Sequence, residues 1–139
     1  MTTICANLKT MCADKMVSGG AVFSTTKIHR IGNSLYGGAG DYEPIIMFMR
    51  WRIDPSQVPE FRAEDAFNVL ELNPHGLYCW GPRLVPMLIE NDFYAIGSGS
   101  GVALGALAHG ATLQAAIKTA SRWDECTGSE VTTLHLKAK

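Results

Sequence analysis

Short apolar segments separated by turn residues fill the first third of the chain. Leu8-Lys9 lies between two such segments, as in a tight hairpin, and Gly19-Gly20 and Asn33 interrupt the pattern further on. Four strands are therefore predicted: residues 2–7, 10–13, 22–31 and 34–36. The first of these strands would begin at Thr2.

The next segment has the character of a helix. Asp41 suits an N-cap, and residues 42–52 are apolar on nearly all sides of the predicted helix. The large apolar side chains are those of Ile45, Ile46, Met47, Phe48, Met49 and Trp51. Because one sheet covers only one side of a helix, we expect another surface to cover the rest.

Asp54-Pro55 and Pro59 end this helical pattern and leave room for no more than a helical stub over residues 60–67. Strands are then predicted at residues 68–72, 77–80 and 92–96, helices at 101–108 and 112–123, and a last strand from Val131 to Leu134 or Leu136. This order predicts an α+β fold in which two antiparallel sheets are sandwiched between helices. We find no internal repeat and no domain boundary, so residues 1–139 are expected to form a single domain.

Composition excludes several classes of partner. Of the 139 residues, 47% are hydrophobic and 18% charged, as in an ordinary globular domain with a core. Twelve basic residues against 13 acidic ones give a net charge of −1, which offers no electrostatic footprint for nucleic acid or an anionic membrane. The apolar runs, such as residues 45–49, fall far short of the roughly 20 residues that a membrane-spanning helix needs.

Neither the cysteines nor the histidines have ligand spacing. Cys5, Cys12, Cys79 and Cys126 form no C-x-x-C pair, and the first twelve residues lack the pattern of a signal peptide. We therefore expect reduced thiols and a cytoplasmic location. The four histidines are scattered, so we expect no metal and no cofactor.

Thr2 is the first candidate for chemistry. A threonine near an N-terminus is usually an ordinary strand residue, but Thr2 directly follows Met1, which an aminopeptidase removes readily before a small residue. Mature Thr2 would then carry both a nucleophilic hydroxyl and a base, its own α-amine. The ordinary pKa of an α-amine is about 7.7 to 8, close to the value that a base needs near neutral pH.

Motifs at matched distances support this interpretation. They are Thr2-Thr3-Ile4, Asp14, Lys27, Gly37-Gly38-Ala39-Gly40-Asp41, Gly97-Ser98-Gly99 and Asp124-Glu125-Cys126-Thr127-Gly128. In this order they resemble the proteasome β-subunit family, most closely the bacterial HslV-type peptidases. The resemblance covers nearly the whole chain. It implies the four-layer αββα sandwich of the N-terminal-nucleophile hydrolases, here with a shortened helical layer, and a threonine endopeptidase that hydrolyses peptide bonds.

The resemblance also implies a role for each matching residue. Lys27, otherwise a solvated strand charge, would lie beside the Thr2 hydroxyl and lower the pKa of the α-amine, with Asp14 holding its ammonium in place. Gly40, otherwise part of a flexible turn, would present its N–H to the oxyanion. Residues assigned to a polar network at the mature N-terminus are Ser98, Asp124 and Thr127, the last where the family usually has serine. Substrate-binding candidates are Ser18, Gly38 and Tyr42.

The glycine-rich segment Gly97 to Gly101 has an alternative interpretation as a nucleotide-binding loop, which its spacing does not support. Gly97 to Gly101 follows a predicted strand and precedes a helix, as a nucleotide-binding loop does. However, Gly101 stands one residue too early for the dinucleotide fingerprint, and the remaining chain is too short for the rest of such a domain.

The helices between the glycine run and Gly97 depart from the pattern of the family, and they bear on the assembly. The family usually has two long helices between the glycine run and Gly97, whereas Pro55 and Pro59 leave room for one. Peptides or unfolded proteins are the implied substrates, a homo-oligomer with contacts through residues 42–52 is predicted, and an ATPase unfoldase is the partner that the resemblance suggests. Two alternatives stay open: a non-catalytic scaffolding subunit of the same fold, and an amidase that acts on small molecules.

Overall fold

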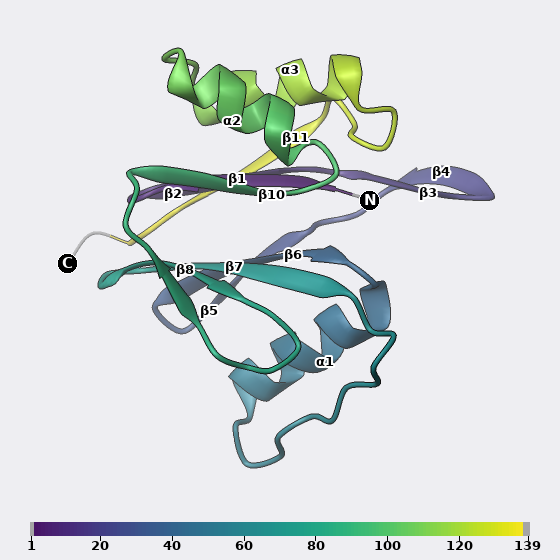
Figure 1. Ribbon diagram of the computed structural model, residues 1–139, viewed down its shortest axis with the longest axis vertical. Helices are drawn as coiled ribbons and strands as arrows, with labels where there is room; N and C mark the ends of the chain where they lie inside the picture. Colours follow the sequence, from purple (N-terminus) through teal and green to yellow (C-terminus); the bar gives the residue numbers. More distant parts are fainter. Residues whose placement is uncertain (1, 138–139) are drawn as a thin grey trace.

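The computed structural model describes residues 2–137 and has four layers: two helices, two sheets and a third helix (Figure 1). The first sheet has the order β10-β1-β2-β11. Its strands are β1 (Thr3–Asn7), β2 (Thr10–Asp14), β10 (Phe93–Gly97) and β11 (Val131–His135). Helices α2 (Ser100–Ala108) and α3 (Leu113–Trp123) cover its outer face.

The second sheet has the order β5-β6-β7-β8-β9. Its strands are β5 (Ile28–Ile31), β6 (Ser34–Gly40), β7 (Phe67–Asn73), β8 (Gly76–Trp80) and β9 (Met87–Ile89). Helix α1 (Tyr42–Ile53) covers the outer face of this sheet. A separate hairpin of β3 (Met16–Gly19) and β4 (Ala21–Ser24) extends from the side of the molecule. Within the described residues all of these strand pairs are antiparallel, and the predicted α+β architecture of two antiparallel sheets between helices is confirmed.

Alternation along the strands builds the core between the two sheets. On β1, Ile4 and Ala6 face the inter-sheet core that contains Leu35 and Leu70, whereas Cys5 faces the layer of α2 and α3. This is the period of two that an extended strand imposes on its side chains. Strand β1 is therefore buried on both faces and is held between β2 and β10, which fixes the position of the residue that precedes it, Thr2.

An aromatic cluster joins α1 to the second sheet. Phe48 is fully buried and makes edge-to-face contacts with Tyr36, Phe67 and Trp80, with ring centroids 5.4 to 6.4 Å apart. On α1, Pro44, Phe48 and Met49 are buried, and Phe61 of the segment between α1 and β7 packs against the same cluster. Three apolar side chains of α1 stay exposed: Tyr42, Met47 and Ile53.

Two sequence-based predictions of local structure are wrong. Residues 22–31 form two strands rather than one, because Thr25 N donates to Lys15 O (2.8 Å) and the chain leaves the β3–β4 hairpin there before β5 joins β6. Residues 60–66 form no helical stub and lead as an irregular segment into β7. Strands β3 and β9 were not predicted, and the glycine run belongs to β6 rather than to a turn.

The N-terminal hairpin, α1 and the last two helices agree with prediction to within about two residues, the usual uncertainty of helix ends. Asp41 does occupy the N-cap of α1, but its carboxylate accepts a hydrogen bond from Ala66 N (2.9 Å) rather than from the helix. Among residues 2–137, no helix has the length and apolar character required to cross a membrane.

Candidate active site

Thr2 lies directly before β1, with 7% of its surface exposed. The next residue, Thr3, pairs with Gly97 of β10. Gly97 has φ +99°, and a Cβ at this position would collide with the carbonyl oxygen of Thr2. Only glycine permits this close approach, so β10 and its turn position the backbone of Thr2.

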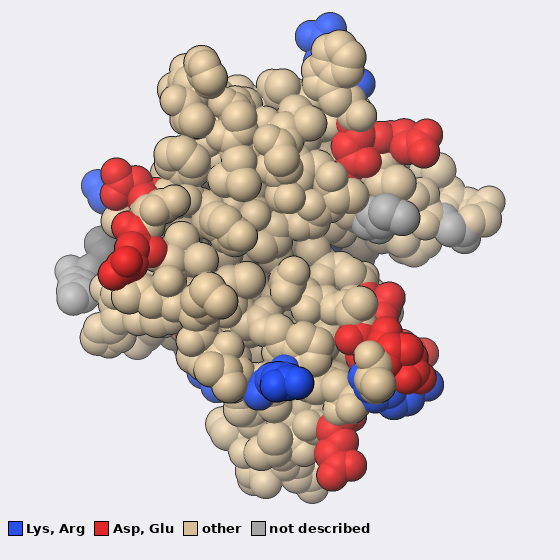
Figure 2. Space-filling model, viewed as in Figure 1, with Lys and Arg blue, Asp and Glu red and all other residues tan. Residues whose placement is uncertain are grey.

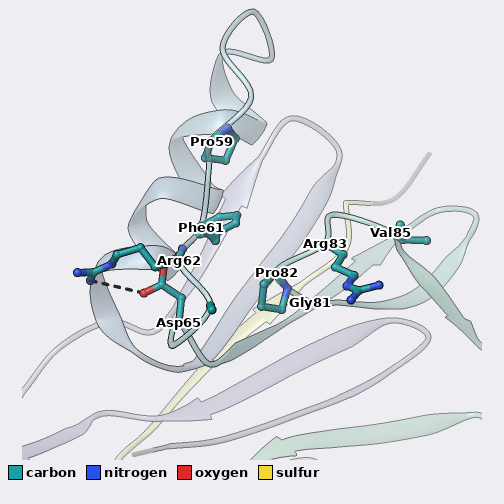
Figure 3. A pocket seen from close by; sticks show the side chains of 9 residues that line it. Pro59, Phe61, Arg62, Asp65, Gly81, Pro82, Arg83 and Val85 are labelled. Carbon is teal, nitrogen blue, oxygen red and sulfur yellow. Dashed lines mark hydrogen bonds and ion pairs between the residues drawn. The ribbon is translucent and has the colours of Figure 1, made fainter.

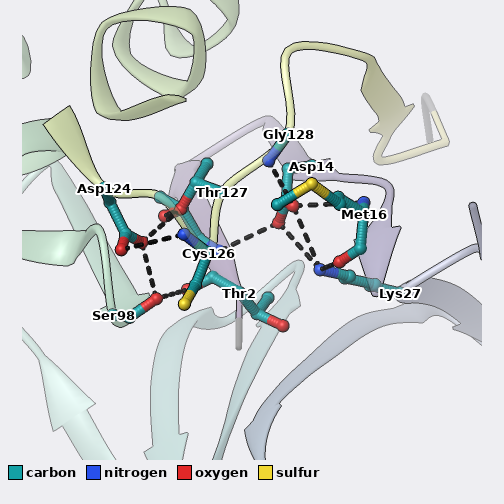
Figure 4. Close-up of polar contacts among 10 residues, drawn as sticks. Thr2, Asp14, Met16, Lys27, Ser98, Asp124, Cys126, Thr127 and Gly128 are labelled. Carbon is teal, nitrogen blue, oxygen red and sulfur yellow. Dashed lines mark hydrogen bonds and ion pairs between the residues drawn. The ribbon is translucent and has the colours of Figure 1, made fainter. Parts of the chain in front are cut away.

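Asp14 is a fully buried carboxylate at the end of β2 (Figure 4). Its oxygens accept hydrogen bonds from three backbone amides: Thr3 N (3.0 Å), Met16 N (3.2 Å) and Gly128 N (2.9 Å). It also forms an ion pair with Lys27, whose Nζ lies 3.1 Å from each carboxylate oxygen. A buried charge is tolerated when it is paired and hydrogen-bonded, as this one is.

Lys27, the partner of Asp14, is also buried and hydrogen-bonded. Its side chain is 7% exposed, and Nζ also donates to Met16 O at 2.5 Å. Burial lowers the pKa of Lys27, and the nearby Asp14 carboxylate opposes this effect only in part. The result is an ammonium group of fixed position that borders the same cavity as Thr2.

A second polar network lies on the other side of Thr2. Ser98 Oγ donates to Asp124 Oδ2 (2.6 Å) and lies 3.5 Å from Thr2 O. Thr127 Oγ1 donates to the same carboxylate oxygen at 2.6 Å. Burial raises the pKa of Asp124, but hydrogen bonds from Ser98, Thr127 and Cys126 N outweigh it and leave the pKa below its ordinary value.

The proton directions in this network follow from its acceptor. Because Thr127 gives its only hydroxyl proton to Asp124, the 2.7 Å contact between Thr127 Oγ1 and Thr3 Oγ1 must use the Thr3 proton. Gly99 leaves the space for this pair, since a Cβ there would collide with Thr3 Oγ1 and lie 2.9 Å from Thr127 Oγ1. The network therefore connects β1, the β10–α2 turn and the segment after α3.

Two cavities meet at Thr2. The first, of about 390 Å³, has an apolar wall from α1 formed by Ile45, Ile46 and Met49 and a polar wall formed by Thr25, Thr26, Lys27 and His29. The second, of about 460 Å³, is an open groove between the two sheets. Both are bordered by Thr2 and Gly40. A larger cavity of about 690 Å³ lies elsewhere, between residues 59–65 and 81–85, and contains none of the predicted site residues (Figure 3).

The glycines of β6 have structural reasons to be glycine. Gly40 has φ +118°, and a Cβ there would collide with Ala66 O and lie 2.7 Å from the Cα of Phe67. At Gly38 a Cβ would lie 2.5 Å from Ile45 Cγ2. Glycine at position 40 is therefore required by the backbone conformation and by the close packing of β6 on the start of β7, whatever the role of its N–H.

The predicted substrate-binding residues differ in position. Tyr42 is 71% exposed at the start of α1 and borders the first cavity, as does Gly38. Ser18 lies on β3 opposite Val22 and is exposed, and its neighbour Val17, not Ser18 itself, borders the cavity.

Several polar groups of the site were missed by sequence reasoning. The backbone amides of Met16 and Gly128, the carbonyl of Met16 and the hydroxyl of Thr3 all belong to the two networks. Backbone groups carry no side-chain signal, although the Thr2-Thr3 pair could have drawn attention to Thr3. Within residues 2–137, the His, Cys, Asp and Glu side chains form no group of three or more that could hold a metal ion.

Comparisons with known proteins bear on the fold. No protein-family model matches the sequence, and no curated protein matches it. Among solved structures, HslV from Trypanosoma brucei is 20% identical with a TM-score of 0.75 over 98% of this chain and 99% of that chain. BPH from Thiobacillus denitrificans is 19% identical with a TM-score of 0.74 over 99% of each chain, and its complex with epoxomicin is 20% identical with a TM-score of 0.70 over the same shares.

These similarities confirm the predicted resemblance at the level of the fold. The chain has the four-layer α+β fold of HslV and BPH along almost its entire length. Its helical layer on the second sheet consists of α1 and the irregular segment that follows it.

Proposed function

We propose that this protein is a threonine-type peptidase in which Thr2, freed of the residue or residues that precede it, is the nucleophile. The observation that carries the proposal is the position of Thr2 at the junction of two cavities, beside a buried Lys27–Asp14 pair and with Ser98 against its carbonyl. The fold shared with HslV and BPH supports the same conclusion.

In the proposed reaction the Thr2 hydroxyl attacks the carbonyl carbon of a peptide bond. The α-amine of Thr2 takes the hydroxyl proton, directly or through water, and the Lys27 ammonium stabilises the developing negative charge on Oγ1. Asp14 holds Lys27 in position through two 3.1 Å contacts. The N–H of Gly40, which borders both cavities, is proposed to donate to the oxyanion.

The tetrahedral intermediate then breaks its C–N bond, and the α-ammonium returns the proton to the departing nitrogen. The product of this half reaction is an ester between Thr2 Oγ1 and the acyl half of the substrate. Water, deprotonated by the same amine, hydrolyses the ester and restores the free hydroxyl. The α-amine requires a pKa near neutrality for this role, and the ammonium of Lys27 nearby favours the neutral amine.

The second network is proposed to keep the N-terminus in position. With its own proton given to Asp124, Ser98 presents only acceptor lone pairs to any further donor. The freed α-amine of Thr2 is such a donor. Asp124 and Thr127 thus act as positioning residues through Ser98 and Thr3.

Peptides or unfolded chains are the proposed substrates, and a homo-oligomer is the proposed assembly. Most of the face in Figure 2 carries no charged side chain, and most of the Lys, Arg, Asp and Glu residues seen there lie near its edges. Apolar side chains left exposed in the single chain include Met47, Ile53, Phe23, Met87 and Trp123. An unfoldase partner and a cytoplasmic location stay predictions, the second of them compatible with four free cysteines.

Intact mass spectrometry with epoxomicin tests the catalytic proposal, because a structural neighbour was solved in complex with this compound. We expect the mature protein to begin at Thr2 and to gain the mass of one epoxomicin molecule. The Thr2→Ala variant should gain none, and Thr119→Ala, a matched change on α3 outside both cavities, should react like the wild type. Full retention of Met1, or no adduct on a protein that begins at Thr2, would overturn the proposal.

A further inference from the structure

We propose that the open groove between the sheets binds the part of a peptide substrate that leaves as the amine, the segment on the C-terminal side of the cleaved bond. This inference rests on the proposed peptidase function and assigns the groove's uncommitted polar side chains, Asn68, Tyr94 and Ser100, to substrate binding.

The two cavities lie on opposite faces of β6. On this strand Leu35 and Ala39 face the inter-sheet core, whereas Tyr36 faces the aromatic cluster under α1. The first cavity includes Gly38 and three residues of α1 and therefore opens on the α1 face. The groove includes Ala39 and strand β10 and opens between the sheets. A peptide that passes Thr2 can thus occupy one cavity on each side of the bond to be cleaved.

The groove is on the side of Thr2 from which an amine would depart. Ser98, which lies against the Thr2 carbonyl, borders the groove and not the first cavity. Lys27 borders the first cavity and not the groove. When the C–N bond breaks, the departing nitrogen takes a proton from the α-ammonium of Thr2. This group is attached to the Thr2 backbone, whose carbonyl Ser98 approaches. The acyl half stays esterified to Oγ1 with its side chain in the first cavity.

The lining of the groove suits a peptide backbone. Asn68 lies on β7 between Phe67 and Val69, which both pack in the cluster under α1, so its side chain faces the inter-sheet space. Tyr94 packs against the inter-sheet core and borders the groove from the opposite sheet. Within residues 2–137, the side-chain polar atoms of Asn68, Tyr94 and Ser100 make no hydrogen bond, whereas those of Ser98 and Asp124 are engaged with each other.

The two cavities differ in the chemistry of their linings. The first cavity has an apolar wall that accepts a side chain, whereas the groove presents amide and hydroxyl groups that match the N–H and C=O groups of an extended chain.

Two substrates that share the same acyl half but differ after the cleaved bond distinguish binding in the groove from binding in the first cavity. The short substrate ends at the scissile bond in an aminocoumarin, and the long one continues for three residues to a quencher. For each protein the measured quantity is the ratio of kcat/KM for the long substrate to that for the short one. In the double variant Asn68→Ala with Tyr94→Phe we expect this ratio to fall about tenfold, the effect of two neutral hydrogen bonds.

Matched controls and a second measurement keep the test decisive. Asn33→Ala and Tyr78→Phe, which border neither cavity, should keep the wild-type ratio. In addition, a dipeptide amide added as acyl acceptor should attack the ester of the wild-type enzyme and form a new peptide, and the yield of this peptide should saturate as the amide concentration rises. In Tyr94→Phe alone, a higher amide concentration should be needed for saturation. A ratio within about twofold of wild type together with unchanged saturation would overturn the assignment of the groove while leaving the peptidase intact. Failure of the wild type to cleave either substrate would overturn the proposed function, and the groove assignment with it.

Discussion

Asp14 and Glu71, the two buried carboxylates of residues 2–137, are satisfied in different ways. Asp14, in the first sheet, faces the ammonium of Lys27 and three backbone amides. Glu71, in the second sheet, accepts hydrogen bonds from four neutral side chains: Ser34 (2.7 Å), Tyr36 (3.1 Å), Asn73 (3.0 Å) and Trp80 (2.9 Å). Burial raises the pKa of Glu71, but these four bonds outweigh it and hold the pKa below its ordinary value.

The contrast shows that burial of a charge does not by itself mark a functional group. Glu71 fastens neighbouring strands of one sheet and borders neither cavity at Thr2. Asp14 holds a cation that does border such a cavity. A carboxylate whose partner is an ammonium beside a cavity is a candidate for chemistry, whereas one saturated by neutral donors inside a sheet is a structural group. The predictions that follow test this distinction.

The largest effect is expected for Lys27→Ala. Loss of the ammonium removes the positive charge proposed to stabilise the Thr2 alkoxide, so hydrolysis should fall about 1000-fold. The fold should survive with a lower free energy of unfolding, because three backbone amides still bind Asp14 but its buried charge loses the ion pair. The measurements are kcat/KM on the short substrate and circular dichroism of the same sample. Activity within about twofold of wild type would remove Lys27 from the site.

Asp14→Asn and Glu71→Gln are matched substitutions that replace one oxygen with an NH2 group. In each case the new donor would face a donor, which costs about 1 to 3 kcal/mol of unfolding free energy. Activity should separate the two variants: Asp14→Asn should lose about 100-fold because Lys27 loses its anion, and Glu71→Gln should stay within about twofold. Urea unfolding and kcat/KM measure the two properties, and equal losses of activity would contradict the distinction.

Gly99→Ala and Gly105→Ala test how tightly the second network is packed. At Gly99 a Cβ would collide with Thr3 Oγ1, so this variant should be destabilised by about 1 to 3 kcal/mol and should lose activity. At Gly105, within α2, a Cβ meets no atom within 4 Å, so alanine should raise the unfolding free energy by about 0.4 to 1 kcal/mol. The thermal midpoints of the two variants should therefore move in opposite directions.

Smaller effects are expected in the pH dependence, first in that of stability from Glu71. Its folded-state pKa lies below the unfolded value, so its contribution is fully present above the ordinary pKa near 4.5 and is lost as the pH falls through the folded-state pKa. Glu71→Gln should remove part of the loss of stability on acidification. Urea midpoints between pH 3 and pH 6 would show this as a flatter profile for the variant, and a parallel profile would contradict it.

Lys27 is expected to affect the alkaline side of the pH profile. Because burial lowers its folded-state pKa below 10.5, the folded protein releases this proton first, and stability from this group rises with pH up to the unfolded pKa. Activity, in contrast, should fall on the alkaline side as the Lys27 ammonium deprotonates, at a pH below 10.5. The pH profile of kcat/KM gives this limit, and an alkaline limb above 10.5 would show that Lys27 is not the group observed.

The sequence alone was sufficient where local pattern decides local structure. The hairpin around Leu8-Lys9, helix α1 with Asp41 at its N-cap, and helix α3 were predicted because turn residues, apolar spacing and caps act within a few residues. The motifs also selected Thr2, Asp14 and Lys27 as candidates, since side chains able to perform chemistry are visible in a sequence, and their catalytic roles stay predictions.

The tertiary structure decided which groups complete the site. Met16, Gly128 and Thr3 join it through backbone atoms or a common hydroxyl, and they meet only because β2, β11 and the segment after α3 come together across more than one hundred residues. The break at residues 25–27 depends likewise on two partner strands, β3 and β6, that no local signal specifies. Backbone donors and strand partners carry no residue-type signal, so long-range packing alone determines where they converge.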